Sequence, residues 1–202
     1  MSKLKPTYKM PFRRRKEGKT DYRKRLVLLK SEKPRLVVRK SLKYITAQLV
    51  EYSEAGDKTI ASTNSKQLVG LGWKFACDNT PAAYLTGLLI AKKAEKAGRK
   101  ITEAVLDAGL YPSTKGSRIY AVAKGARDAG LDIAVDESVL PSDERIIGSH
   151  IAKANAERFK DLPAEFEKMK EIILGKILGK ETKETKAVKE KKGKTETGEK
   201  VR

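Results

Sequence analysis

Apolar and polar positions alternate along residues 34–63 in the manner of β-strands. The segment 35–39 carries three apolar residues between arginines, and the segment 44–52 places apolar residues on one face at a spacing of two. Residues 54–57 have the composition of a turn, and a third short strand is expected over 59–63. These segments predict an antiparallel meander.

From Thr80 onward the apolar spacing changes to steps of three and four, which predicts a helix capped by Thr80 and ended by Gly98. A short apolar strand is expected over 101–106, and a second helix is expected to be capped by Ser117 and stopped by Gly130. Together these elements predict an α/β fold. The predicted fold has a small mixed β-sheet with two helices packed on it. The sheet consists of the antiparallel meander and one more strand, which the chain reaches through a crossover helix.

Two further helices are expected after this core, one over 142–158 that begins with Ser142, and one that begins with Pro163. The first thirty-odd residues hold too few apolar positions to bury and predict an extended arm, and the last segment has the composition of a disordered tail. The predicted organisation is a basic arm (1–33), an α/β core (34–133), a helical extension (134–175) and a disordered basic tail (176–202).

Charge is distributed unevenly along the chain, which has 202 residues and a formal net charge of +19. Residues 1–43 contain 17 basic and 3 acidic residues, residues 44–175 contain 18 of each, and residues 176–202 contain 10 and 5. A neutral body with basic ends is typical of a protein that lays its extensions onto nucleic acid. The alternative is a soluble domain whose charged ends only keep it dispersed.

Aromatic residues interrupt the basic run of the arm at Tyr8, Phe12 and Tyr22. Flat rings among guanidinium groups can stack on unpaired bases, a role that a purely solubilising segment would not need. The alternative is that these rings dock onto the core of the protein itself.

Catalytic and metal-binding patterns are not found in the sequence: it contains no P-loop, nucleophile elbow or metal-ligand spacing. Cys77 and His150 are the only residues of their types, and His150 is interpreted as a surface or packing residue. Asp107 is interpreted as a cap or salt-bridge partner rather than a general base. We therefore expect no enzyme activity, catalytic residue, metal, cofactor or small-molecule substrate.

Membrane association is not expected either, because no apolar run is long enough to span a bilayer and the N-terminal segment is charged where a signal peptide would be apolar. These features predict a cytoplasmic protein.

Several motifs, in one order, resemble the family of the 5S-rRNA-binding large-subunit ribosomal protein, which is protein eighteen in bacteria and archaea and protein five in eukaryotes. The resemblance covers roughly residues 8–160, and the arm and the helical extension are similar to the archaeal type. The motifs that carry it are Tyr8–Tyr22, Pro34–Ser41, Asn79–Ala83, Leu106–Asp107, Gly109–Leu110, Gly116, Arg118, Lys124–Gly125, Asp128 and Gly130–Leu131.

The resemblance implies a structural constituent of the large ribosomal subunit, located in the cytoplasm. Such a protein would bind 5S rRNA in the central protuberance and join it to the large-subunit rRNA. A neighbouring 5S-binding ribosomal protein would be its protein partner.

The residues that the resemblance implies as RNA contacts are basic, aromatic or glycine residues of three segments. They are Phe12, Arg13, Arg14, Arg15, Lys19, Tyr22, Arg23 and Arg25 of the arm, Arg35, Arg39 and Lys40 of the first strand, and Lys115, Gly116 and Arg118 of the glycine loop. Gly109 and Gly116 are expected to allow positive φ or a close approach of backbone to RNA.

The chain departs from the bacterial pattern at Ala108 and Leu110, where that pattern has Arg and a second Gly, and at Ala134–Val135, which replace Pro-His. The first half of the glycine loop is therefore left open.

Two other functions remain open at this point. A DNA-compacting protein would also combine basic ends with a neutral core, and it would bind duplex DNA and RNA alike. A small-molecule enzyme on an α/β fold would need a pocket with paired titratable groups, which the sequence does not show.

Overall fold

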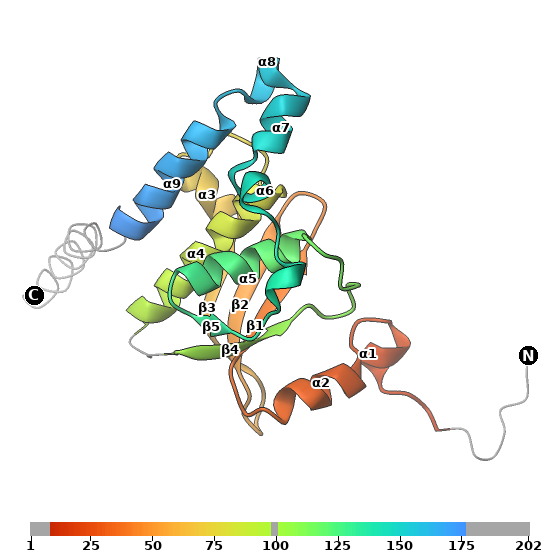
Figure 1. Cartoon of the computed structure of the whole chain (residues 1–202). Helices are drawn as coiled ribbons and strands as arrows, with labels where there is room; N and C mark the ends of the chain where they lie inside the picture. Colours follow the sequence, from red (N-terminus) through yellow and green to blue (C-terminus); the bar gives the residue numbers. More distant parts are fainter. Residues whose placement is uncertain (1–8, 98–100, 177–202) are drawn as a thin grey trace, which may run out of the picture.

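The computed structural model describes residues 9–97 and 101–176, which form a mixed five-stranded sheet covered on one face by helices (Figure 1). In space the strands follow the order β3-β2-β1-β4-β5. Their bounds are β1 (Arg35–Lys40), β2 (Ile45–Glu51), β3 (Lys58–Asn64), β4 (Glu103–Asp107) and β5 (Asp132–Ile133). The meander β1-β2-β3 is antiparallel, and β4 pairs parallel with β1 after a crossover through a helix, so the predicted α/β fold is confirmed. The short parallel strand β5, beyond β4, was not predicted.

The two faces of the sheet differ because successive side chains of a strand point to opposite sides. Leu36 and Val38 of β1 are fully buried and lie opposite Leu49 and Ala47 of β2, so this face belongs to the core. The opposite face of the sheet carries Arg35, Val37 and Arg39 of β1 together with Gln48 and Val50 of β2. We call it the open face.

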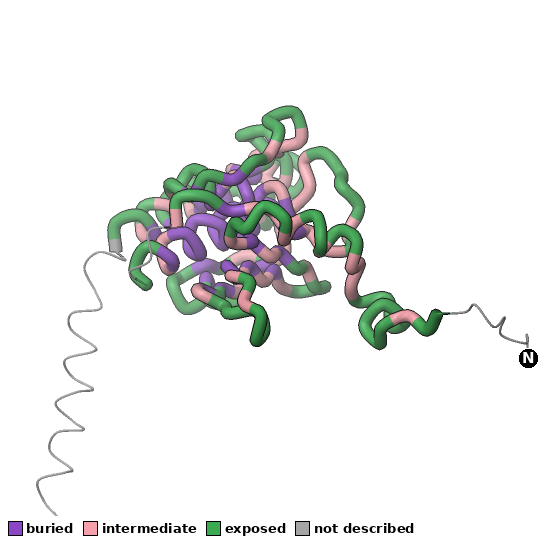
Figure 2. Tube along the Cα trace, turned by 90° about the horizontal axis from the view of Figure 1, so that it is seen from below, coloured by how far each residue is buried: buried purple, intermediate pink, exposed green. Residues whose placement is uncertain are grey.

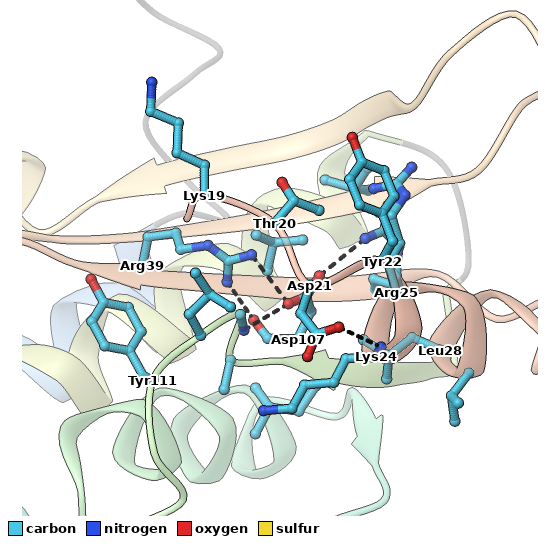
Figure 3. Close-up of a pocket in the computed structure, with 18 of the residues that line it drawn as sticks. Lys19, Thr20, Asp21, Tyr22, Lys24, Arg25, Leu28, Arg39, Asp107 and Tyr111 are labelled. Carbon is cyan, nitrogen blue, oxygen red and sulfur yellow. Dashed lines mark hydrogen bonds and ion pairs between the residues drawn. The ribbon is translucent and has the colours of Figure 1, made fainter. Parts of the chain in front are cut away.

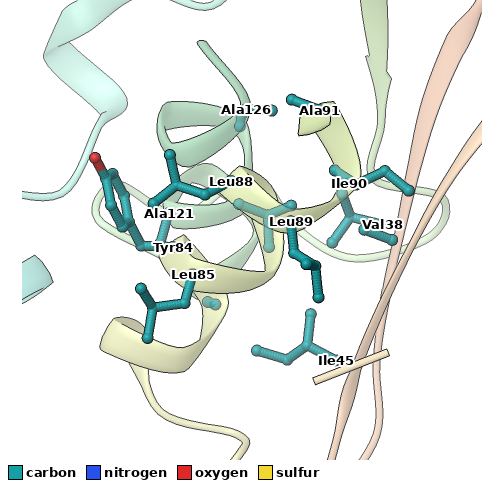
Figure 4. Packing of buried hydrophobic residues seen from close by; sticks show 14 of the residues in the cluster. Val38, Ile45, Tyr84, Leu85, Leu88, Leu89, Ile90, Ala91, Ala121 and Ala126 are labelled. Carbon is teal, nitrogen blue, oxygen red and sulfur yellow. The ribbon is translucent and has the colours of Figure 1, made fainter. Parts of the chain in front are cut away.

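Two helices, α4 (Thr80–Lys96) and α5 (Arg118–Asp128), cover the core face. Figure 4 shows Leu89 and Ile90 of α4 beside Ile45 and Val38 of the sheet, and Ala121 and Ala126 of α5 next to α4.

The predicted cap of α4 is wrong by one residue. Asn79 has the extended backbone of an N-cap, and its side-chain oxygen accepts a hydrogen bond from the N–H of Ala82 at 2.8 Å, so Thr80 already lies in the first turn. The predicted stop at Gly98 lies outside the described residues. Ser117 precedes α5 as predicted, although its side chain makes no capping bond.

The C-terminal part consists of short helices that lead into one long helix. The bounds of its helices are η1 (Glu137–Val139), α6 (Asp143–Ile147), α7 (Ser149–Ala154), α8 (Ala156–Phe159) and α9 (Leu162–Lys176). The prediction of α9 is confirmed, and its residues Phe166, Met169 and Ile173 are buried in the same core cluster as α4.

The prediction of one helix over 142–158 is wrong, because Gly148 breaks it with a φ of 87°. A Cβ on Gly148 would lie 2.1 Å from Cδ2 of Leu162, so the path of the chain here depends on the packing of α9. His150 is exposed just after the break, as the surface interpretation predicted.

Residues 9–30 are not simply extended, which corrects the prediction for this part of the arm. They form α1 (Arg13–Lys16) and α2 (Tyr22–Leu29), and a third helix that was not predicted, α3 (Lys66–Leu71), follows β3. Asp21 caps α2 by accepting hydrogen bonds from the N–H groups of Arg23 and Lys24, at 3.0 and 3.3 Å. Neither arm helix buries a residue, and in Figure 2 the arm projects from the body as a mostly exposed segment.

Candidate nucleic-acid interface

A cleft of about 1100 Å³ lies between the arm and the open face of the sheet (Figure 3). One wall consists of arm residues, which are Arg14, residues 19–25 and residues 27–28, and another consists of the open face around Val37 and Gln48. The loop 108–113, which follows β4, closes one end. Three segments that are distant in the sequence therefore meet at one site.

Five charged side chains form a continuous chain along this cleft: Arg25, Asp57, Arg35, Asp107 and Arg39. Nη2 of Arg25 donates to both carboxylate oxygens of Asp57 at 2.9 Å each, and Nη2 of Arg35 donates to Oδ2 of Asp57 at 2.7 Å. Nη1 of Arg35 donates to Oδ2 of Asp107 at 3.0 Å, and Nη2 of Arg39 donates to Oδ1 of Asp107 at 3.1 Å. This row of ion pairs links α2, the β2–β3 turn, β1 and the end of β4.

The position of Asp57 favours its charged form. Partial burial alone would raise the pKa of this carboxyl, but hydrogen bonds from Arg25 and Arg35 and the charges of both guanidinium groups outweigh burial and lower the pKa. Asp57 is therefore a stable anion in the middle of a basic surface.

The first half of the glycine loop is held against β1. Gly109 has a φ of 64°, and its N–H donates to Oδ1 of Asp107 at 2.8 Å. Nη1 of Arg39 donates to the backbone carbonyls of Asp107 and Val38 at 2.8 and 2.9 Å. A Cβ on Gly109 would lie 2.8 Å from Cζ of Arg39, so the glycine allows the loop to approach Arg39 closely. Asp107 is a salt-bridge partner, as predicted.

Tyr111 holds the same loop from the other side. Its hydroxyl donates to the carbonyl oxygen of Lys40 at 2.6 Å, and Nζ of Lys40 lies 5.0 Å from the centre of its ring. The Tyr111 ring therefore covers one side of the Lys40 ammonium group.

The predicted arm residues lie mostly on the surface. The Phe12 ring is 72% exposed and lies 5.2 Å from the ring of Tyr22, so in the described structure these two rings contact each other rather than the core. Glu17 pairs with Arg13 and with Lys19, at 3.7 and 2.9 Å. Nε of Arg14 donates to Oγ1 of Thr20 at 2.9 Å, and Arg15 and Arg23 are exposed. Tyr8 lies outside the described residues.

Lys115, Gly116 and Arg118 do not line the cleft. Gly116 has a φ of 66°, as expected, and its N–H donates to the carbonyl of Val139 at 2.9 Å. Nη1 of Arg118 donates to the backbone carbonyl of Asp78 at 2.7 Å. These three residues form a second location. The predicted contacts that line the cleft are Arg14, Lys19, Tyr22, Arg23, Arg25, Arg35 and Arg39.

Arg35 differs from the other predicted contacts because its side chain is only 3% exposed and binds two aspartates. It is part of the framework of the cleft. Sequence reasoning missed this, and it also missed the role of Asp57. The alternation along β1 gave no signal of this, since it places Arg35 on the same open face as the exposed Arg39.

The residues 9–97 and 101–176 include no group of three or more His, Cys, Asp or Glu side chains placed to hold a metal ion. Among the same residues, no helix has the length and apolar character that crossing a membrane requires.

A family model described as "Ribosomal large subunit proteins 60S L5, and 50S L18" matches residues 6–100 and 93–136. The matched segments run from the arm through β5, so they contain all the residues that line the cleft and cover more than half of the chain. This family has a structural role in the ribosome rather than an enzymatic one. The chain therefore belongs to the family of the large-subunit ribosomal proteins 60S L5 and 50S L18.

Proposed function

We propose that this protein binds 5S rRNA and joins it to the large-subunit rRNA in the central protuberance. The observation that carries the proposal is the placement of the basic arm: in a chain of a large-subunit ribosomal family, α1 and α2 lie beside the open face and form a cleft lined by cationic side chains.

Unpaired cations on the arm support the proposal. Arg15, Lys16, Arg23 and Lys24 are exposed and form no ion pair with another residue of the described structure, so their charges are available to phosphates. Guanidinium groups present forked donors that suit phosphate oxygens, and duplex RNA is recognised mainly through its shape, phosphates and 2′-hydroxyls.

The proposed contacts are the exposed and half-buried members of the set that the resemblance implies, without the buried Arg35. Arg25 and Arg39 contribute with the part of each guanidinium that the aspartates leave exposed. Among the proposed contacts, those that line the cleft are Arg14, Lys19, Tyr22, Arg23, Arg25 and Arg39. The others on the arm and β1 are Phe12, Arg13, Arg15 and Lys40, and those at the second location are Lys115, Gly116 and Arg118. Two separate locations suit a protein that joins two RNA molecules.

By the same resemblance we propose a cytoplasmic location in the large subunit and a neighbouring 5S-binding ribosomal protein as partner. DNA compaction is the competing function, because basic extensions on a neutral body also suit duplex DNA.

A competition experiment separates the two functions. Labelled 5S rRNA is bound to the purified protein and challenged with unlabelled 5S rRNA, with duplex RNA of unrelated sequence and with duplex DNA of equal length. Only 5S rRNA is expected to compete at low excess. If about six to ten phosphates are neutralised, affinity should fall by orders of magnitude between low and moderate salt. Equal competition by duplex DNA would favour compaction, and affinity that is insensitive to salt would contradict the electrostatic basis.

A further inference from the structure

The attachment of α2 to the sheet depends on very few contacts. The helix buries none of its residues, and a large cleft separates much of it from the open face. Within the described residues, Arg25 is the only residue of α2 whose side chain makes an ion pair or hydrogen bond to the sheet or its turns. In that contact, Nη2 of Arg25 donates to both carboxylate oxygens of Asp57.

Asp57 itself is anchored firmly. It belongs to the turn between β2 and β3, its side chain is 28% exposed, and it also binds the buried guanidinium of Arg35, which Asp107 holds from the other side. Arg25 is thus tied through Asp57 to the centre of the sheet.

We infer that Asp57 is a positioning residue for RNA binding, which holds α2 across the open face so that the arm cations are presented in one arrangement. The inference rests on the proposed function of the same surface. An arm that is already ordered loses less conformational entropy when RNA binds, and it therefore binds more tightly than a free arm with the same charge.

If Asp57 positions the arm, removing its carboxylate should change RNA affinity in the direction opposite to that expected from charge alone. Removing a carboxylate from a basic surface raises its positive potential and would strengthen attraction to a polyanion. If Asp57 positions the arm, its removal weakens binding even though the net charge of the protein becomes more positive.

The test compares Asp57→Asn with Glu54→Gln in the full chain. Glu54 lies in the same turn, is exposed and has no ion pair among the described residues, so both variants remove one negative charge from one place. In a salt titration of 5S rRNA binding, Glu54→Gln should bind at least as tightly as the wild type. Asp57→Asn should bind at least about fivefold more weakly. Its salt dependence should also be flatter, because fewer arm cations reach phosphates.

A second variant covers the case in which Asp57→Asn fails to fold, since that change leaves Arg35 with one partner fewer. Arg25→Lys keeps the charge and leaves the Arg35–Asp57 pair intact, but the lysine side chain is shorter than that of arginine, so its Nζ falls short of the position from which Nη2 of Arg25 donates to Asp57. It should weaken 5S rRNA binding and speed hydrogen exchange in α2, while exchange in β1, β2 and β3 stays slow.

The outcomes separate the two levels of the proposal. A wild-type protein that fails to bind 5S rRNA would refute the proposed function. A wild type that binds, with Asp57→Asn as tight as Glu54→Gln, would overturn the positioning role and leave the proposed function standing. The role is also overturned if Arg25→Lys loosens α2 while 5S rRNA affinity stays at the wild-type value.

Discussion

Two aspartates organise the arginines of the open face. Asp57 joins Arg25 to Arg35, and Asp107 joins Arg35 to Arg39. A buried guanidinium charge is tolerated only beside matching anions, which explains why Arg35 has two carboxylate partners, although its Nε has no hydrogen-bond partner among the described residues. The acidic residues thereby determine which arginines serve the fold and which remain exposed.

Asp57 predicts a specific dependence of stability on pH. Its folded-state pKa lies below the usual value of 3.8, so its contribution to the free energy of unfolding is fully present above that value and is lost as pH falls through the folded pKa. The wild type should exceed Asp57→Asn by about 1–3 kcal/mol near neutral pH. This difference should stay constant down to about pH 5 and shrink below about pH 4, where Asp57 takes up a proton.

The measurement is urea unfolding of both proteins across this pH range. Glu54→Gln serves as the control and should remain near the wild type throughout. A difference that grows in acid would contradict the assigned ion pairs.

At the scale of elements, the contact between α4 and α5 organises the core. The helices approach closely because each carries a glycine at the crossing: a Cβ on Gly87 would lie 2.1 Å from the carbonyl oxygen of Val122, and a Cβ on Gly125 would lie 2.1 Å from that of Tyr84. Burial raises the pKa of Tyr84, so its phenol stays protonated and donates to Asp128 at 2.6 Å. α9 then packs on α4 through Phe166, whose ring lies 5.6 Å from that of Tyr84.

The crossing predicts that Gly87→Ala destabilises the protein, because the methyl group would meet backbone that cannot move without separating the helices. The free energy of unfolding should fall by about 1–3 kcal/mol, as expected for an overpacked core. Gly70→Ala is the matched control. Gly70 is a helical glycine of α3 with nothing within 4 Å of its added Cβ, and alanine there should stabilise by up to about 1 kcal/mol. Thermal and urea unfolding of both variants measure these changes. Equal changes in the free energy of unfolding would show that the α4–α5 crossing is not tight.

At the scale of the whole molecule, charge and fold are separated along the chain. Residues 44–175 have equal numbers of basic and acidic residues, while residues 1–43 and 176–202 carry the net positive charge. Neutrality lets the body pack without strong self-repulsion, and the N-terminal charge lies beside the cleft on α1 and α2.

The last segment should be dispensable for both folding and 5S rRNA binding. The predicted disordered tail lies almost entirely outside the described residues, and its net charge is about a third of that of residues 1–43. A chain cut after Lys176, where α9 ends, should keep its melting temperature and lose less than about tenfold in affinity, or 1.4 kcal/mol. A larger loss, measured in the same salt titration, would make the tail an RNA contact.

Local patterns in the sequence determined the family and most of the regular elements, namely β1 to β4, α4, α5 and α9, but not α1, α2, α3 or β5. The alternation in β1 and β2, the three-and-four spacing in α4 and α5, and the order of the motifs can all be read without distant contacts, because periodicity and capping act within a few residues. The same local reading was less accurate at ends and breaks, where Asn79 rather than Thr80 caps α4.

Only the tertiary structure decided which polar residues serve the fold. Arg35 and Asp107 are 72 positions apart in the sequence, and their pairing arises because β4 returns parallel to β1. The break at Gly148 likewise follows from Leu162 occupying the adjacent space. A sequence pattern reports the preference of a residue, but burial and ion pairing depend on neighbours that only the folded chain brings together.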